Sequence, residues 1–128
     1  MNETIVRYRG RYLNLVERAG WEYRTRSNAS AVVVIIAVTD DDRLLLVEQL
    51  RRPLEARVIE LPAGLVGDTG DPEEDVLEAA NRELVEETGF EAESLEVIPY
   101  VRRSTAFDVY RSSRLASVSA ISASSDSR

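Results

Sequence analysis

The stretch RELVEETG, residues 82–89, combines a helix-forming pattern with three glutamates. Glu83, Glu86 and Glu87 lie one to four positions from one another along the chain. Like charges three or four residues apart on a helix cost roughly a few tenths of a kcal/mol per pair. The stretch therefore forms either a solvated face or a face with a partner that offsets the repulsion.

The helix that contains this stretch is expected to run from Pro72 to about Thr88. Asp71 is a favourable N-cap residue, Pro72 suits the first helical position, and Glu74 would complete a capping box. Gly89 is the residue type that commonly ends a helix. The sequence thus predicts one helix between Asp71 and Gly89.

The glutamates occupy a specific side of this helix. At about 100° per residue, Glu83 and Glu87 fall inside or beside the apolar stripe, and Glu86 flanks them. A carboxylate at the margin of a core requires a partner, because an unpaired buried charge is costly. A divalent cation would satisfy this requirement, and so would arginines of the preceding segment; the spacing leaves both open. The apolar stripe consists of Val76, Leu77, Ala80 and Leu84, and the arginines are Arg51, Arg52 and Arg57.

A family resemblance is carried by Glu74 followed, after seven residues, by RELVEETGF at residues 82–90. This pattern resembles the Nudix box, the metal-binding loop and helix of enzymes that hydrolyse nucleoside diphosphates linked to another group. The segments LLLVEQLRRP and IELPAGLVGD are similar to the ADP-ribose pyrophosphatase branch. The resemblance covers roughly residues 7–100 and implies an α/β/α sandwich with a mixed β-sheet, preceded by N-terminal strands. One departure is an apparent four-residue insertion between Gly64 and Glu74.

The resemblance also implies a site and a reaction. The reaction is Mg²⁺- or Mn²⁺-dependent hydrolysis of a pyrophosphate bond, with ADP-ribose, cut to AMP and ribose 5-phosphate, as the expected substrate. The alternative is a catalytically weak or inactive protein that still binds metal or nucleotide. The implied metal ligands are the carbonyl of Ala63 and the carboxylates of Glu83, Glu86 and Glu87, with Arg82 orienting a glutamate; the implied substrate contacts are Arg51, Arg57 and Glu60.

Composition excludes several other sites. The 128-residue chain has no histidine, cysteine or lysine, so a histidine base is excluded and a zinc site of the usual kind is not expected. A bound metal would have oxygen ligands, which favours Mg²⁺, Mn²⁺ or Ca²⁺. The net charge of −7 argues against nucleic-acid binding, and no apolar run approaches the roughly 20 residues of a membrane span. The absence of a signal-peptide pattern and of cysteine predicts a cytoplasmic location.

The rest of the chain is divided into three parts. Residues 1–30 are expected to form short strands that help to build a homodimer, with Trp21 and Tyr23 packed in a core rather than stacked on a base. Residues 31–111 are expected to form the Nudix domain, and residues 112–128 a disordered tail, because eight of these 17 residues are serine. Strands are expected at residues 32–38 (buried on both faces), 43–50, 58–61, 94–101 and 106–111, with a loop at residues 62–75.

The C-terminal part departs from the family pattern. The segment from Arg102 onward does not resemble the last strands, the late catalytic loop and the final helix of similar enzymes. Only Asp108 and Asp126 offer carboxylates there. The sequence therefore predicts a truncated or altered C-terminus that lacks the usual general base.

Overall fold

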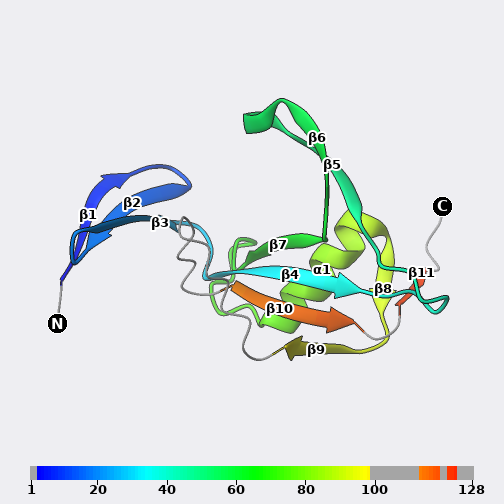
Figure 1. Ribbon diagram of the computed structural model, residues 1–128. Coiled ribbons are helices and arrows are strands. Elements are labelled where there is room, and N and C mark those ends of the chain that lie inside the picture. The colour runs from blue at the N-terminus through cyan, green and yellow to red at the C-terminus, as the bar shows by residue number, and fades with distance from the viewer. Residues whose placement is uncertain (1–2, 99–112, 119–120, 124–128) are drawn as a thin grey trace.

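The computed structural model describes residues 3–98, 113–118 and 121–123. Its strands and helices form a four-stranded sheet with one α-helix, a separate three-stranded sheet and a projecting hairpin (Figure 1). In chain order the elements are β1 (Thr4–Arg9), β2 (Leu13–Arg18), β3 (Trp21–Arg26), β4 (Ala31–Ala37), β5 (Val47–Arg51), the 3₁₀ turn η1 (Arg52–Leu54), β6 (Ala56–Glu60), β7 (Ala63–Val66), α1 (Val76–Thr88), β8 (Phe90–Ala92), β9 (Leu95–Ile98), β10 (Ser113–Val118) and β11 (Ile121–Ala123).

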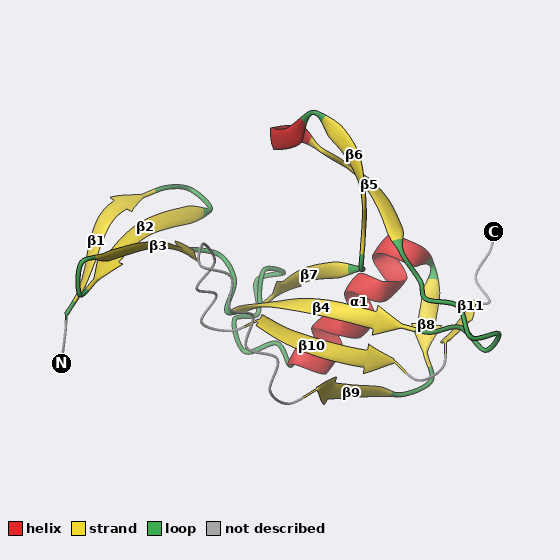
Figure 2. Ribbon diagram, in the orientation of Figure 1, coloured by secondary structure: helices red, strands yellow, loops and turns green. Residues whose placement is uncertain are grey.

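The central sheet has the strand order β7-β4-β10-β9 and is mixed, because β10 runs parallel to β4 while the other pairs are antiparallel. Helix α1 packs against this sheet (Figure 2). The core between them is fully apolar and consists of Val33, Ile35, Ala37, Val66, Ala79, Ala80 and Leu84. The predicted α+β fold with a mixed sheet is confirmed. In the described ranges α1 is the only α-helix, so they contain one helical layer of the expected sandwich.

Strand β4 was predicted to be buried on both faces, and the structure corrects this. Val33, Ile35 and Ala37 point towards α1 and are fully buried, whereas the alternate residues are half-buried. Successive side chains of a strand point to opposite faces. The difference arises because α1 covers one face of the sheet only.

The segment after residue 111 also differs from its prediction. Residues 113–118 form β10, which pairs with β4 on one side and with β9 on the other, and residues 121–123 form β11, which pairs with β8. A serine-rich composition gave the expectation of disorder, but pairing with two neighbouring strands satisfies the backbone regardless of side chain. The predicted strand at 106–111 lies outside the described residues.

The segment predicted as a loop contains β7, and the helix begins later than expected. Asp75, not Asp71, is the N-cap: its side chain accepts a hydrogen bond of 2.8 Å from the N–H of Leu77. Asp71 instead accepts from the N–H of Glu73 and closes a separate turn. The predicted end of the helix is confirmed, because Gly89 caps α1 in the left-handed conformation with φ of 74°.

Strands β1–β3 form an antiparallel sheet that lies beside the central one (Figure 1). The expectation that Trp21 packs in a core is wrong, because 77% of this residue is exposed; Tyr23 is half-buried. Strands β5 and β6 form a hairpin that projects from the domain, with η1 at its tip. The predicted strand at 43–50 shifts to Val47–Arg51, because Leu44 makes only an isolated bridge to Val38. None of the described helices is long and apolar enough to cross a membrane.

Candidate functional site

Helix α1 places two carboxylates against the sheet rather than in solvent. Ala79, Ala80 and Leu84 are fully buried. On a helical wheel, Glu83 and Glu87 lie between Ala79 and Ala80, and therefore within the buried arc rather than at its margin. The sequence could place the glutamates beside the apolar stripe, but only the burial of Ala79 shows that the stripe surrounds them.

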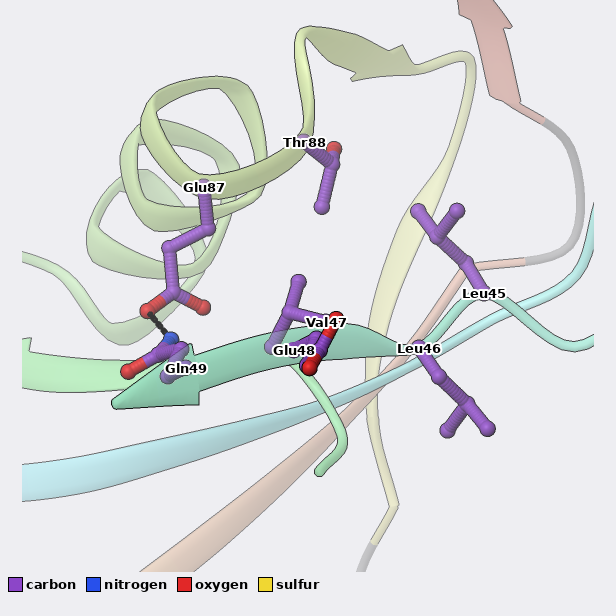
Figure 3. A pocket seen from close by; sticks show the side chains of 7 residues that line it. All are labelled: Leu45, Leu46, Val47, Glu48, Gln49, Glu87 and Thr88. Atoms are coloured by element: carbon purple, nitrogen blue, oxygen red, sulfur yellow. Dashed lines mark hydrogen bonds between the residues drawn. The ribbon is translucent and has the colours of Figure 1, made fainter. Parts of the chain in front are cut away.

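Glu87 is held by two neutral donors from different strands. One of its carboxylate oxygens accepts from the backbone N–H of Ala63 in β7 at 3.1 Å. The other accepts from the side-chain amide of Gln49 in β5, as Figure 3 shows. Gln49 and Glu87 also line a cavity of about 490 Å³, whose other walls are Leu45, Leu46, Val47, Glu48 and Thr88.

Glu83 is held differently, one turn earlier. Its Oε1 accepts from the guanidinium of Arg82 at 2.8 Å and from the backbone N–H of Leu65 at 3.3 Å. The side chain passes directly over Gly64: a Cβ at this position would lie 1.8 Å from the carboxyl carbon of Glu83. Gly64 is therefore required by the close approach of a side chain, not by an unusual backbone angle.

Arg82 joins the helix to the loop that follows β7. Besides Glu83, its guanidinium donates to both oxygens of Glu74, at 3.0 and 3.2 Å, and to the carbonyl of Leu65 at 2.9 Å. It also reaches Asp68 at 3.4 Å. Glu74 in turn accepts from the N–H of Gly67 at 2.7 Å. The apparent insertion between Gly64 and Glu74 is therefore folded onto Arg82.

The ionisation of these groups follows from their surroundings. Burial raises the pKa of Glu83, with repulsion from Glu86 adding to it and Arg82 opposing it. The hydrogen bond from Arg82, and then that from Gly67, lowers the pKa of Glu74. The pKa of Arg82 is raised mainly by its hydrogen bond to Glu74. The negative charge of Glu83 is thus only partly compensated within the chain.

The predicted substrate residues are divided between the two faces of the β5–β6 hairpin. Arg51 pairs with Glu60 at 2.6 Å, and Arg57 pairs with Glu48 at 2.7 Å. Since side chains alternate along a strand, Arg51 lies on the same face of β5 as Gln49. Arg57 lies opposite Leu50 in the ladder and therefore on the other face. The structure brings Arg51 and Glu60 to the face that carries Gln49, and Arg57 to the outer face.

These contacts bear on two of the three arginines, Arg51 and Arg57, that the sequence offered as partners for the glutamates of α1. Arg51 and Arg57 pair within the hairpin, not with the glutamates of α1. Arg82 from α1 itself pairs with Glu83, and Glu87 has neutral donors. Pairing with Arg51 or Arg57 therefore does not account for the half-buried carboxylates of Glu83 and Glu87.

Comparison with known proteins agrees with this arrangement of strand, loop and helix. A family model described as the NUDIX domain matches residues 28–125. The chain belongs to the Nudix family. The match includes β10 and β11, which follow residue 111.

Several relatives match part of the chain. It is 44% identical over 54 residues to a methanol dehydrogenase activator of Bacillus methanolicus, which is 42% of this chain and 27% of that protein. It is 40% identical over 65 residues to an ADP-ribose pyrophosphatase of Bacillus subtilis, which is 51% of this chain and 33% of that protein. It is 43% identical over 58 residues to an ADP-sugar pyrophosphatase of Mus musculus, which is 45% of this chain and 25% of that protein. The matches thus span 25–33% of the length of these three relatives.

A solved structure, "Crystal structure of ADP compounds hydrolase", resembles this Nudix chain with a TM-score of 0.66. The alignment covers 96% of this chain and 68% of the other. The sequence identity is 24%, so the likeness concerns the fold. It supports the assignment of a Nudix α+β architecture made above.

The oxygen atoms around the Nudix helix suit a hard divalent cation, because such ions prefer carboxylate and carbonyl oxygens as ligands. Within the described ranges, Oε2 of Glu83 accepts no hydrogen bond and keeps its lone pairs. Glu83, Glu87 and the carbonyl of Ala63 are the groups that would hold the ion. Glu86 is the outlying member, since its side chain is 60% exposed and lies 3.7 Å from Arg82. In the part of the chain that the structure describes, no three acidic side chains are grouped so that together they could hold a metal ion.

Sequence reasoning missed two contributors to the Nudix site. Gln49 contacts Glu87, and Asp68 contacts Arg82. For Gln49 a weak signal existed, because it precedes Arg51 by two residues and so shares its strand face. For Asp68 no signal existed, since its contact depends on how the loop folds back.

Proposed function

We propose that this Nudix chain hydrolyses the pyrophosphate bond of a nucleoside diphosphate linked to another group, with Mg²⁺ or Mn²⁺ as cofactor. The observation that carries the proposal is the pair of half-buried carboxylates, Glu83 and Glu87, held against the strand β7. ADP-ribose, cut to AMP and ribose 5-phosphate, is the proposed substrate. The names of the pyrophosphatases from Bacillus subtilis and Mus musculus support this choice.

The reaction adds water across one P–O–P linkage. A P–O bond forms to the oxygen of water, the bond to the bridging oxygen breaks, and the two products are phosphate monoesters. A bound divalent cation would supply charge neutralisation and lower the pKa of water. Glu83 and Glu87 would hold that cation, and Arg82 would orient Glu83. Arg51 would exchange its contact with Glu60 for a phosphate of the substrate. The cation would thus allow an anionic substrate to bind at an acidic site, because it reduces the repulsion between their negative charges.

The test is hydrolysis of ADP-ribose with Mg²⁺, measured by release of AMP. Glu83→Gln and Glu87→Gln are each expected to lower kcat/KM by more than about 100-fold. Loss of a residue that only supports a metal ligand costs about 10–100-fold, and loss of the ligand itself should cost more. Glu78→Gln is the matched control, since Glu78 is an exposed glutamate on the same helix. Unchanged rates in both site variants would refute the proposal. Binding of ADP-ribose without turnover by the unaltered chain would favour the inactive alternative.

The choice of substrate is tested separately. GDP-mannose and dinucleoside polyphosphates are compared with ADP-ribose under the same conditions. A kcat/KM highest for ADP-ribose is expected. A higher kcat/KM for GDP-mannose or a dinucleoside polyphosphate would support pyrophosphate hydrolysis but contradict ADP-ribose as the substrate.

A homodimer formed through β1–β3 is part of the proposal. These strands expose apolar side chains, including Tyr8 at 66% and Trp21 at 77%. Burial of such a surface against a second copy would be favourable. Light scattering is expected to give twice the chain mass, and a monomer would refute this part. The cytoplasm is the proposed location, because a cysteine-free composition suits a reducing compartment.

A further inference from the structure

The carboxylate of Glu87 needs external support for two reasons. It lies in the last turn of α1, where the carbonyl end of the helix dipole disfavours negative charge. No basic residue occupies that turn. Glu83 lies one turn earlier on the same face and adds a second negative charge. The hydrogen bonds from Ala63 and Gln49 are what the described part of the chain offers in compensation.

Each of those two donors binds a different oxygen of the carboxylate. Ala63 donates to Oε2 and Gln49 donates to Oε1. A carboxylate held at both oxygens cannot rotate about its terminal bond without losing one contact. Removal of either donor would leave a group with one contact and a free torsion. The amide of Gln49 therefore fixes the direction in which Glu87 presents its remaining lone pairs.

The chemistry of the donor is also specific. A guanidinium at this place would neutralise Glu87 and compete with a cation, as Arg82 partly does at Glu83. A side-chain amide satisfies one lone pair of the carboxylate and leaves its charge intact. Gln49 thus combines orientation with an undiminished charge.

Gln49 also occupies a connecting position. Among the described residues, its bond to Glu87 is the hydrogen bond that links the β5–β6 hairpin to α1. It shares a strand face with Arg51, which the proposed function assigns to the substrate. Figure 3 shows Gln49 pointing from β5 directly to Glu87 at the edge of the cavity.

We propose that Gln49 is a positioning residue that aims Glu87 at the divalent cation and couples the substrate-carrying hairpin to the cation site. The inference rests on the proposed function and assigns a role to a residue that touches neither the cation nor the reacting atoms. Loss of such a supporting partner typically costs about 10–100-fold in metal affinity or activity.

The experiment measures Mn²⁺ binding by electron paramagnetic resonance on the full chain, independently of turnover. Gln49→Met keeps the length of the side chain and removes the donor, and is expected to weaken Mn²⁺ binding at least about tenfold. Gln49→Glu places a carboxylate against Glu87 and is expected to weaken it further. Leu50→Ala, on the opposite face of β5, is the control and should leave Mn²⁺ affinity unchanged.

A second readout separates positioning from general damage. In Gln49→Met the Mg²⁺ concentration that gives half-maximal rate is expected to rise, while KM for ADP-ribose at saturating Mg²⁺ stays within about twofold. If Gln49→Met does not fold, Gln49→Asn, whose amide is one methylene too short to reach, replaces it with the same expectation.

The outcomes distinguish this inference from the proposed function. Mn²⁺ affinity within twofold of the unaltered chain in Gln49→Met, together with loss of binding in Glu87→Gln, would overturn the role of Gln49 alone. Unchanged affinity in Glu87→Gln as well would overturn the assignment of the cation site, and with it the proposed function.

Discussion

Glu83 and Glu87 lie one turn apart on the same face of α1, yet their surroundings differ. Glu83 lies at the side of the loop after β7, where Arg82, Glu74 and Leu65 form a dense network. Glu87 lies at the side of β5, beside a cavity, and its donors are neutral. The Glu83 half of the site is therefore fixed by partly compensated charges, whereas the Glu87 half has neutral donors and keeps its negative charge.

This difference teaches that two carboxylates of one motif can have separate physical roles. The Arg82 network stabilises the loop and holds Glu83 over Gly64. The Gln49 contact contributes orientation with little effect on net charge. Changes on the Arg82 side should therefore affect stability most, and changes on the Glu87 side should affect cation binding.

The largest stability effect is expected from Arg82→Ala. The substitution leaves Glu74 and Glu83 without the guanidinium that pairs with them. Breaking a fully buried ion pair costs about 3–5 kcal/mol. Because 23% of the Arg82 side chain is exposed, a loss of roughly 2 kcal/mol is expected. Urea denaturation at neutral pH measures it. Arg82→Lys, which keeps the charge but not the fork of donors, should fall in between; equal stability of all three proteins would contradict the network.

Gly64→Ala is expected to have the next largest effect. The added methyl group would occupy the position of the Glu83 carboxylate, and overpacking costs about 1–3 kcal/mol. Because Glu83 must move, Mn²⁺ affinity should fall together with stability. Gly70→Ala is a control for space only, because no atom lies within 4 Å of a Cβ there, although its positive φ adds backbone strain. Intact Mn²⁺ binding in Gly64→Ala would show that Glu83 is not needed in its present place.

Glu87→Gln is expected to change the free energy of unfolding by no more than about 0.5 kcal/mol in the presence of EDTA. Removal of a negative charge from the last helical turn stabilises the helix, and the weakened hydrogen bonds of Glu87 destabilise it by a similar amount, so the two effects nearly cancel. Mg²⁺ should raise the melting temperature of the unaltered chain and not that of the variant. A thermal shift with Mg²⁺ that is equal in the two proteins would remove the contrast between Glu83 and Glu87.

The smallest effect concerns pH and Glu74. Its pKa is lowered in the folded chain, so its stabilisation is complete above the ordinary value of 4.5 and is lost as pH falls through the lower, folded value. Glu83, with a raised pKa, acts in the opposite direction. Urea denaturation between about pH 5 and pH 3 should therefore show a smaller loss of stability in Glu74→Gln than in the unaltered chain. Parallel pH profiles would contradict the role of Glu74.

The sequence by itself determined the features that depend on local pattern. The apolar positions and Gly89 define the helix face and its end, since both follow from a repeat of 3.6 residues and from the freedom of glycine at positive φ. The β-branched run before Ala37 defined β4. The spacing of Glu83 and Glu87 placed both carboxylates against the core before any contact was known.

Tertiary structure alone decided the features that depend on distant partners. The helix begins at Val76 because the carboxylate of Glu74 is taken by Gly67 and Arg82, which a local capping rule does not foresee. The serine-rich segment 113–118 is a strand because β4 and β9 both pair with it. Gln49 supports Glu87 across 38 positions of sequence. Local preferences are short-ranged, whereas strand pairing and buried hydrogen bonds are set by whichever groups the fold brings together.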